Sequence, residues 1–290
     1  MTFHIVVDSG CNLTDDLLDR YDISALSYRA RLNGKEFLCY EKGRDHEKAA
    51  KDYYRAMREG ADVATSLVNE EMVKEAVEPY LAEGQDVLFI SISSGISGTY
   101  RQAMTASATF KEKYTAKLVP FDPLAASFGA GMLAIQAAIW RDEGKGIDEV
   151  FGLLEEMKWR VTQVFTVEDL SYLKKGGRIS PLVAIVGTLL KVKPVLRGND
   201  EGKIVIGSKV VGRKKAMNAL VDLYASKAVN PQEQTLYIAH ADCEEEALAV
   251  AKGMKERAGY KDLVIRQYDL CTGTHVGPGT IAVFFLSEHR

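Results

Sequence analysis

The chain has 290 residues, 47% of them hydrophobic, and this is enough for two folded domains with cores of their own. Its 37 basic and 40 acidic residues leave a net charge of -3, so no overall field would attract nucleic acid or an anionic membrane. The four cysteines lie far apart and form no CxxC or Cys/His cluster, which argues against a zinc site and a disulfide framework.

The first half of the chain alternates short apolar runs with amphipathic segments, as βα units do. The expected strands are Phe3–Val7, Ile23–Arg31, Val87–Ser91 and Ala116–Phe121. The expected helices are Leu13–Arg20, His46–Arg58, Glu70–Leu81, Thr99–Lys111, Ser127–Arg141 and Ile147–Lys158. This order predicts an N-terminal α/β domain, residues 1–158, whose largely parallel sheet carries helices on both faces.

The pattern changes around Trp159, and residues 159–290 predict a second α/β domain with a mixed or antiparallel sheet. Its expected strands are Val161–Val167, Val192–Leu196, Ile204–Ser208, Thr235–His240, Leu263–Tyr268 and Ile281–Leu286. Its expected longer helices are Lys214–Lys227 and Glu244–Arg257. The apolar run 181–190 is typical of a buried core helix or of the wall of an apolar ligand tunnel.

The sequence also predicts a cytoplasmic protein that does not insert into a membrane. Its N-terminus becomes polar after Val7, too early for the apolar region of a signal peptide. The longest apolar run, 181–190, is about half of the roughly 20 residues that span a bilayer.

The turn SISSGISGTY, from Ser91 to Tyr100, follows an expected strand and precedes an expected helix. Free N–H groups at such a helix start favour an anion, and Gly95 allows it to approach the backbone. Ser93 and Ser94 fit helix capping and anion binding equally well. The turn does not have the G-x-S-x-G spacing of a nucleophile elbow, and no Walker A motif occurs in the chain.

A second glycine-rich turn, GTHVGPG, runs from Gly273 to Gly279 and has His275 at its centre. A histidine in a loop is usually structural, but flanking glycines such as Gly273 and Gly277 favour contact with a ligand. Two such turns on separate strands predict one composite site.

Other polar residues follow expected strands. Asp8 could be an acid, a metal ligand or a helix cap, and we expect Asp8 and Ser9 to organise a turn at the rim of the pocket. Thr65 lies in an expected loop before the helix at Glu70, and spacing alone cannot bring it to Ser94. Asn12 and Asn69 are expected helix caps.

The segment Lys174–Arg178, KKGGR, is a compact cationic turn. A charge run is usually solvated surface. Two glycines beside an arginine also suit contact with a phosphate or carboxylate, including a nucleotide held by a partner protein. Lys175 and Arg178 are therefore candidate contact residues.

Taken together, these motifs resemble the DegV family, the fatty-acid-binding proteins that serve as carrier subunits of bacterial fatty acid kinase. The resemblance covers nearly the whole chain. Its motifs, in order, are VVDSGCNL at Val6–Leu13, Thr65-Ser66, SSGISGTY at Ser93–Tyr100, YLKKGGRIS at Tyr172–Ser180, Lys193-Pro194 and THVGPGT at Thr274–Thr280. It implies two α/β domains that hold one long-chain fatty acid, with Thr65, Ser94 and His275 at the carboxylate.

The resemblance implies a carrier without catalytic residues, metal or cofactor other than the bound fatty acid. A separate fatty acid kinase would phosphorylate the carboxylate with ATP, and Arg178 and Lys175 would contact that partner. The chain departs from the family pattern at Leu67-Val68-Asn69, at Asp122-Pro123 and at Val211, where an arginine facing the kinase is usual. Arg213 or Arg197 would have to replace that arginine.

Two other functions stay open at this stage. One is an enzyme, a hydrolase or a small-molecule kinase, that uses Ser94, His275 and Asp8. The other is a lipid-binding regulatory protein that has lost its coupling to a kinase, for which Val211 is the hint.

Overall fold

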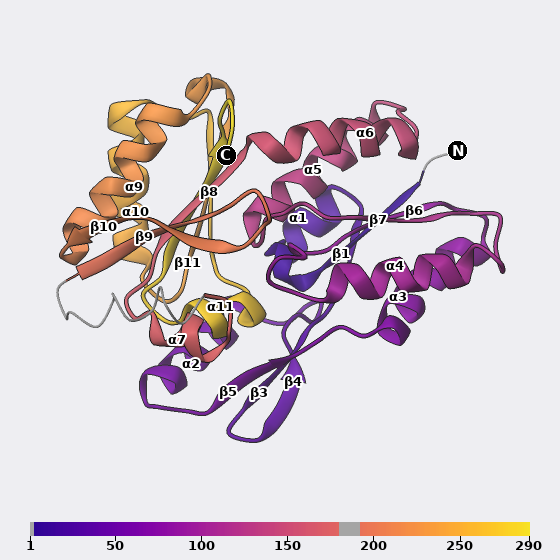
Figure 1. Cartoon of the computed structure of the whole chain (residues 1–290), viewed down its shortest axis with the longest axis horizontal. Coiled ribbons are helices and arrows are strands. Elements are labelled where there is room, and N and C mark those ends of the chain that lie inside the picture. The colour runs from indigo at the N-terminus through magenta and orange to yellow at the C-terminus, as the bar shows by residue number, and fades with distance from the viewer. Residues whose placement is uncertain (1–2, 180–191) are drawn as a thin grey trace.

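The computed structural model describes residues 3–179 and 192–290. Its first sheet is parallel and has the order β2-β1-β6-β7 (Figure 1). The strands are β1 (His4–Asp8), β2 (Ile23–Leu26), β6 (Val87–Ile90) and β7 (Leu118–Phe121). The helices α3 (Glu70–Ala82) and α4 (Thr99–Phe110) cover one face, and α5 (Phe128–Asp142) and α6 (Ile147–Met157) cover the other. The short α1 (Asp15–Arg20) joins β1 to β2.

A small antiparallel sheet with the order β4-β3-β5 projects from this half of the molecule. It consists of β3 (Arg29–Leu32), β4 (Lys35–Leu38) and β5 (Val63–Ser66), and α2 (His46–Arg58) lies between β4 and β5 in the chain. The prediction of one strand over Ile23–Arg31 is therefore wrong. The chain leaves the first sheet at Tyr28, whose N–H donates to Ser9 Oγ, and then enters the small sheet.

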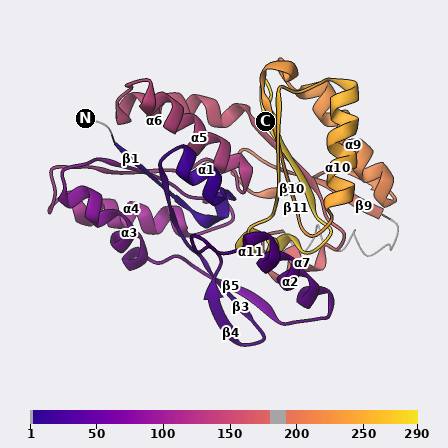
Figure 2. The ribbon, with the colours of Figure 1, turned by 180° about the vertical axis from the view of Figure 1, so that it is seen from behind.

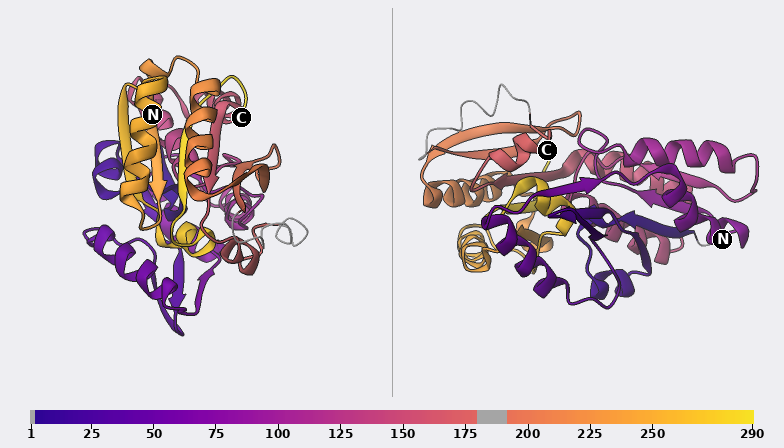
Figure 3. Two further views of the ribbon diagram at one scale, coloured as in Figure 1. Left: turned by 90° about the vertical axis from the view of Figure 1, so that its left-hand side faces the viewer. Right: turned by 90° about the horizontal axis from the view of Figure 1, so that it is seen from below.

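The second large sheet has the order β10-β9-β8-β13-β11-β12 and is antiparallel except between β11 and β12. Its strands are β8 (Val161–Thr166), β9 (Val192–Gly198), β10 (Ile204–Val211), β11 (Thr235–His240), β12 (Asp262–Gln267) and β13 (Ile281–Leu286). The helices α9 (Arg213–Lys227) and α10 (Glu244–Arg257) lie side by side on its outer face (Figure 3). The predicted fold class, a parallel α/β sheet followed by a mixed one, is confirmed. The apolar run 181–190 lies outside the described residues.

Two short helices occupy the region between the sheets and the small sheet. They are α7 (Ser171–Lys175) and α11 (Leu270–Val276), and α11 contacts α7, β3 and β5 (Figure 2). The segment Gly273–Val276, which the sequence predicted as a turn, is thus helical. Asp269 caps this helix, because its carboxylate accepts from the N–H of Thr272. The glycines at positions 273, 277 and 279 favoured the prediction of a turn over that of a capped helix.

The helix α5 lies between the two large sheets and is buried along most of its length. On one side it contacts β1 and the single turn η1 (Ser9–Cys11), and on the other it contacts β8, β11 and β13. The ring of Phe128 lies 5.3 Å from that of Tyr237 and 6.2 Å from that of Phe284, centroid to centroid. A helix that is apolar on all sides needs such surroundings, and it joins the two sheets into one core.

The close contact of α5 with η1 predicts an unusual response to alanine substitution. A Cβ at Gly131 would lie 2.6 Å from the carbonyl oxygen of Cys11, which is backbone and cannot move aside. Gly131→Ala should therefore lower the free energy of unfolding by about 1–3 kcal/mol, although alanine favours helices by about 1 kcal/mol. Gly152→Ala in α6 is the matched control, because no atom lies within 4 Å of its new Cβ. Urea denaturation should show Gly152→Ala stabilised, and stabilisation of both variants would contradict the close contact.

Candidate functional site

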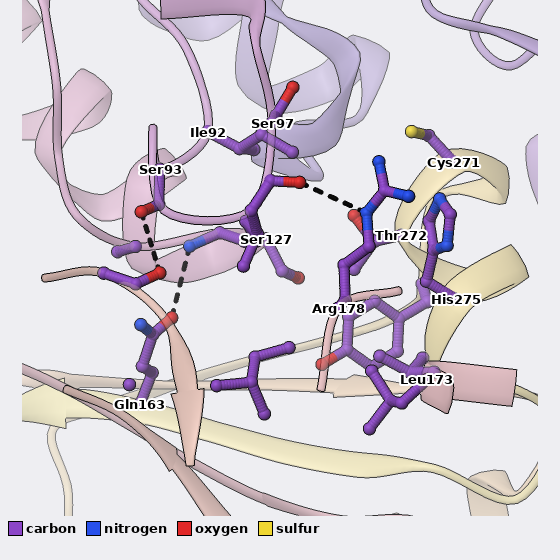
Figure 4. Close-up of a pocket in the computed structure, with 18 of the residues that line it drawn as sticks. Ile92, Ser93, Ser97, Ser127, Gln163, Leu173, Arg178, Cys271, Thr272 and His275 are labelled. Atoms are coloured by element: carbon purple, nitrogen blue, oxygen red, sulfur yellow. Dashed lines mark hydrogen bonds between the residues drawn. The ribbon is translucent and has the colours of Figure 1, made fainter. Parts of the chain in front are cut away.

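A cavity of about 230 Å³ lies where the two halves of the chain meet. Figure 4 shows side chains from both halves around it. Its apolar lining comprises Leu67, Ile92, Ile96, Ala125, Ala126, Phe165, Leu173, Ile204, Val276 and Phe284. Its polar lining comprises Tyr28, Thr65, Ser66, Ser93, Ser97, Ser127, Gln163, Arg178, Tyr268, Cys271, Thr272 and His275. Such a lining suits a ligand that is mostly hydrocarbon and carries one polar group.

Three side chains from three elements form one polar end of the cavity. Thr65 stands on β5, His275 in the last turn of α11, and Arg178 shortly after α7. Thr65 Oγ1 lies 2.8 Å from Nε2 of His275, and Nε of Arg178 donates to the carbonyl oxygen of Ile96 at 3.2 Å. Figure 4 shows Arg178 and His275 together, away from Ser93 and Gln163. The structure thus brings Thr65 and His275 together across 210 residues of sequence.

The charge at this end belongs to the guanidinium. Burial lowers the pKa of His275 to about 4, and the nearby Arg178 contributes in the same direction. The imidazole is therefore neutral at neutral pH, with one nitrogen that donates and one that accepts. The guanidinium of Arg178 supplies the positive charge that a carboxylate or phosphate would need.

The two serines singled out in the first turn do not line the cavity together. Ser93 lines it, and its hydroxyl donates to the carbonyl oxygen of Gly202 at 2.9 Å. The side chain of Ser94 is exposed and lies outside the cavity, and its backbone N–H donates to Asp122 at 3.1 Å. The structure therefore does not bring Ser94 to Thr65 and His275.

Two serines that the sequence analysis passed over do line the cavity. The Ser97 hydroxyl lies 3.0 Å from the Tyr28 hydroxyl, in the same turn as Ser94 but on its inner side. The hydroxyl of Ser127 is buried and has no hydrogen-bond partner among the described residues. A buried hydroxyl without a partner costs about 1–3 kcal/mol, so Ser127 fits a cavity that normally holds a polar group or water. Nothing in a single sequence tells which serine of a turn faces inward.

The glycines of the predicted site act through close packing. A Cβ at Gly95 would meet the carbonyl oxygen of Glu201, and one at Gly273 would meet the Tyr54 hydroxyl. Gly277 has a φ of +81° and lies against the ring of Tyr172. These three glycines therefore position the turn and α11, while other residues line the cavity.

Asp8 and Ser9 lie beneath the cavity wall rather than at its rim. The Asp8 carboxylate is fully buried and accepts from the N–H of Gly10 at 3.0 Å and of Ile92 at 2.8 Å. It organises the turns after β1 and β6, and burial raises its pKa to about 7. Ser94, His275 and Asp8 share no hydrogen bond in the part of the chain that the structure describes, so the geometry gives no support to a hydrolase triad.

The polar end of the cavity adjoins a hollow of about 530 Å³ at the surface. Thr65, Arg178 and His275 line both spaces. The hollow is also lined by Lys175, whose amine lies 3.2 Å from a carboxylate oxygen of Asp62, and by Arg31, 3.8 Å from the other. Lys175 is thus a surface residue, whereas Arg178 reaches the cavity.

The two expected asparagine caps have different outcomes. Asn69 accepts from the N–H of Met72 at 2.9 Å and caps α3, as predicted. The side chain of Asn12 caps no helix N-terminus: it donates to the carbonyl oxygen of Gln267 and accepts from the N–H of Asp269. It links η1 to the start of α11, a contact across the two halves.

Within residues 3–179 and 192–290, no helix is long and apolar enough to cross a membrane. Over the same residues, no three His, Cys, Asp or Glu side chains gather into a group that could hold a metal ion.

Fold and site together define an α/β protein whose two large sheets enclose an apolar cavity with a cationic, hydroxyl-rich end. The family model described as "Uncharacterised protein, DegV family" matches residues 2–288, and the chain belongs to the DegV family. A DegV domain-containing protein of Clostridium perfringens is 38% identical over 99% of this chain and 98% of its own length.

Two solved structures are similar over almost the whole chain. One, described by the words "Fatty Acid Binding of a DegV family Protein", comes from Thermus thermophilus and has a TM-score of 0.88 at 27% identity, covering 99% of this chain and 100% of its own. The other is DegV of Bacillus subtilis, described as a fatty acid binding protein, with a TM-score of 0.83 at 26% identity and the same coverage.

The electrostatics of His275 can be tested by NMR. Its ring should titrate with a pKa of about 4, far below that of a free histidine. Arg178→Gln should raise this pKa, because the positive charge of the guanidinium is one of the two effects that lower it. His240 is the internal control, since burial also lowers its pKa but Arg178 is not among the causes. A wild-type pKa near 6.5 would show that the ring is solvated.

Proposed function

We propose that this chain binds one long-chain fatty acid in the cavity and presents its carboxylate to a separate ATP-dependent kinase. The main support for binding is the cavity itself, which has a large apolar lining and one cationic end formed by Arg178 with Thr65 and His275. The fatty acid binding described for two similar structures supports the choice of ligand.

The tail supplies most of the binding free energy in this proposal. Each buried methylene contributes about 0.8 kcal/mol, so a tail of about 14 methylenes contributes on the order of 11 kcal/mol before the costs of association. Side chains such as Phe165, Leu173 and Phe284 offer that apolar surface. The polar end then determines which way round the acid lies.

The head group is assigned to four side chains. Arg178 provides the charge, and Thr65 and the neutral His275 provide hydrogen bonds beside it. Ser97 takes the place that the sequence suggested for Ser94, because Ser97 lines the cavity and Ser94 does not. Hydrogen bonds to a charged group contribute about 1.5–3 kcal/mol each, which is enough to fix the orientation.

The presentation step rests on the hollow at the surface. A carboxylate held by Thr65, His275 and Arg178 would lie between the cavity and this hollow, within reach of a partner's phosphate. Lys175 is the candidate contact for the partner, while Arg178 serves the bound acid. Val211 is exposed at the end of β10, and Arg213 is paired with Glu246, so Arg213 is not a free replacement for the family's arginine.

The first test is the ligand content of the purified protein. Extraction with organic solvent followed by mass spectrometry should find about one fatty acid per chain. Affinity should rise steadily with chain length up to a sharp limit, because each methylene adds burial until the cavity is full. The proposal would be contradicted if the purified protein carried no acyl chain and bound none when fatty acid was added. Equal affinity for medium and long chains would also contradict it.

The second test compares two serines of one turn. Ser97→Ala should weaken fatty acid binding about tenfold to a hundredfold, because a hydrogen bond to the carboxylate is lost. Ser94→Ala is the matched control and should bind as the wild type does, since its hydroxyl lies outside the cavity. Titration calorimetry with both variants, each checked for an unchanged melting temperature, measures the difference. The reverse pattern would return the head group to Ser94.

A further inference from the structure

A chain of hydroxyl groups connects the buried carboxyl of Asp8 to the wall of the cavity. The Tyr28 hydroxyl lies 3.1 Å from Oδ2 of Asp8, 3.0 Å from Oγ of Ser97 and 2.7 Å from Oγ1 of Thr99. Tyr28 and Ser97 line the cavity, whereas Asp8 lies behind it and has no exposed surface. Tyr28 therefore links the Asp8 carboxyl to the side chains of the cavity wall, and the N–H of Ile92, another lining residue, donates to the same oxygen.

Within residues 3–179 and 192–290, no cation is among the main groups that act on the Asp8 carboxyl. Two backbone N–H groups donate to its oxygens, and Tyr28 faces it from the segment before β3. The other titratable groups that bear on it are the carboxyl of Asp269 at the start of α11 and the thiols of Cys11 in η1 and Cys271 in α11. Burial, the largest effect, raises the pKa of Asp8 to about 7, and Asp269 acts in the same direction. Asp8 thus gains or loses its proton near neutral pH.

The protonation state of Asp8 sets the direction of the hydrogen bonds in this chain. A phenol has one proton and two lone pairs. When Asp8 is ionised, Tyr28 must donate to it and can only accept from Ser97 and Thr99. When Asp8 is neutral, its own proton is donated to Tyr28, and the phenol proton turns toward Ser97 or Thr99. When the phenol proton is donated to Ser97, the proton of Ser97 can point into the cavity or toward Thr99 Oγ1, which lies 3.1 Å away.

We propose that Asp8 and Tyr28 couple the binding of an anionic head group beside Ser97 to the uptake of one proton by Asp8. The proton comes from water and is released when the ligand leaves. Two effects act in the same sense: neutral Asp8 frees a hydroxyl donor for the anion, and it removes a buried negative charge from behind the cavity wall. Asp8 and Tyr28 are positioning residues here, because they act through Ser97. The inference rests on the proposed function, which places the carboxylate at that end.

The coupling fixes the sign of the pH dependence. Below the pKa of Asp8 in the free protein, about 7, Asp8 is protonated with and without ligand, so the affinity is constant. Above it the free protein has lost the proton, and binding has to restore it. The affinity should therefore fall as pH rises from about 7 to 9, by up to tenfold per pH unit.

The test is calorimetry with decanoate, used as a monomer, at pH 8 in two buffers of different ionisation enthalpy. The difference in binding heat counts the protons taken up per ligand. The wild type should take up close to one proton. Tyr28→Phe keeps both N–H bonds to Asp8 but removes the hydroxyl link, and it should take up less than half as many. Because decanoate is the same in both titrations, its own ionisation cancels from the comparison.

Two further variants complete the experiment. Ser94→Ala, outside the cavity, should take up as many protons as the wild type. Asp8→Asn has no proton to gain and should take up none, and circular dichroism checks its fold, because one N–H loses its acceptor. Wild-type binding without proton uptake, or undiminished uptake by Tyr28→Phe, overturns this inference alone. Failure to bind decanoate and longer acids at any pH overturns the proposed function as well.

Discussion

The position of α5 between two sheets is the constraint on which the rest of the structure depends. The helix α5 is buried along most of its length, and one sheet can cover only one of its faces. Both sheets therefore have to pack against it. Small residues make this possible: Gly131 lets the helix touch the backbone of Cys11, and Gly129 lies close to Gln163 and Phe284 of the second sheet. The residues that lead into the same helix, Ala125, Ala126 and Ser127, form part of the cavity wall. The helix that unites the two halves therefore also shapes the space between them.

The protonation states of the titratable groups at the cavity are determined mainly by their burial away from water. Burial lowers the pKa of His275 to about 4, so its ring is neutral, and raises the pKa of Asp8 to about 7. The positive charge of the cavity comes from the guanidinium of Arg178. One positive charge then faces a space with a large apolar lining, to which Thr65 and Ser97 contribute hydroxyls. Such an arrangement favours an anionic group on a largely hydrocarbon body.

Long periodic segments were predictable from the sequence, and short or inward-facing features were not. The helix at Glu70–Ala82 and its cap at Asn69 follow from local rules that the structure obeys. The strands of the small sheet have four residues each, too few for a period to show. The choice between Ser94 and Ser97 depends on which way a turn rotates each side chain, and the meeting of Thr65 with His275 depends on packing across 210 residues. Neither is encoded in local spacing.

The shared wall of the cavity has a thermodynamic consequence. Thr65 and Ser97 belong to one half of the chain, and Gln163, Arg178 and His275 belong to the other, so an occupant completes a single core. An occupant that binds only the native state stabilises it by mass action, by about 2.7 kcal/mol at a free concentration one hundred times its dissociation constant. The unfolding temperature of a preparation will then report its occupancy. Preparations that differ only in what fills the cavity will behave as proteins of different stability.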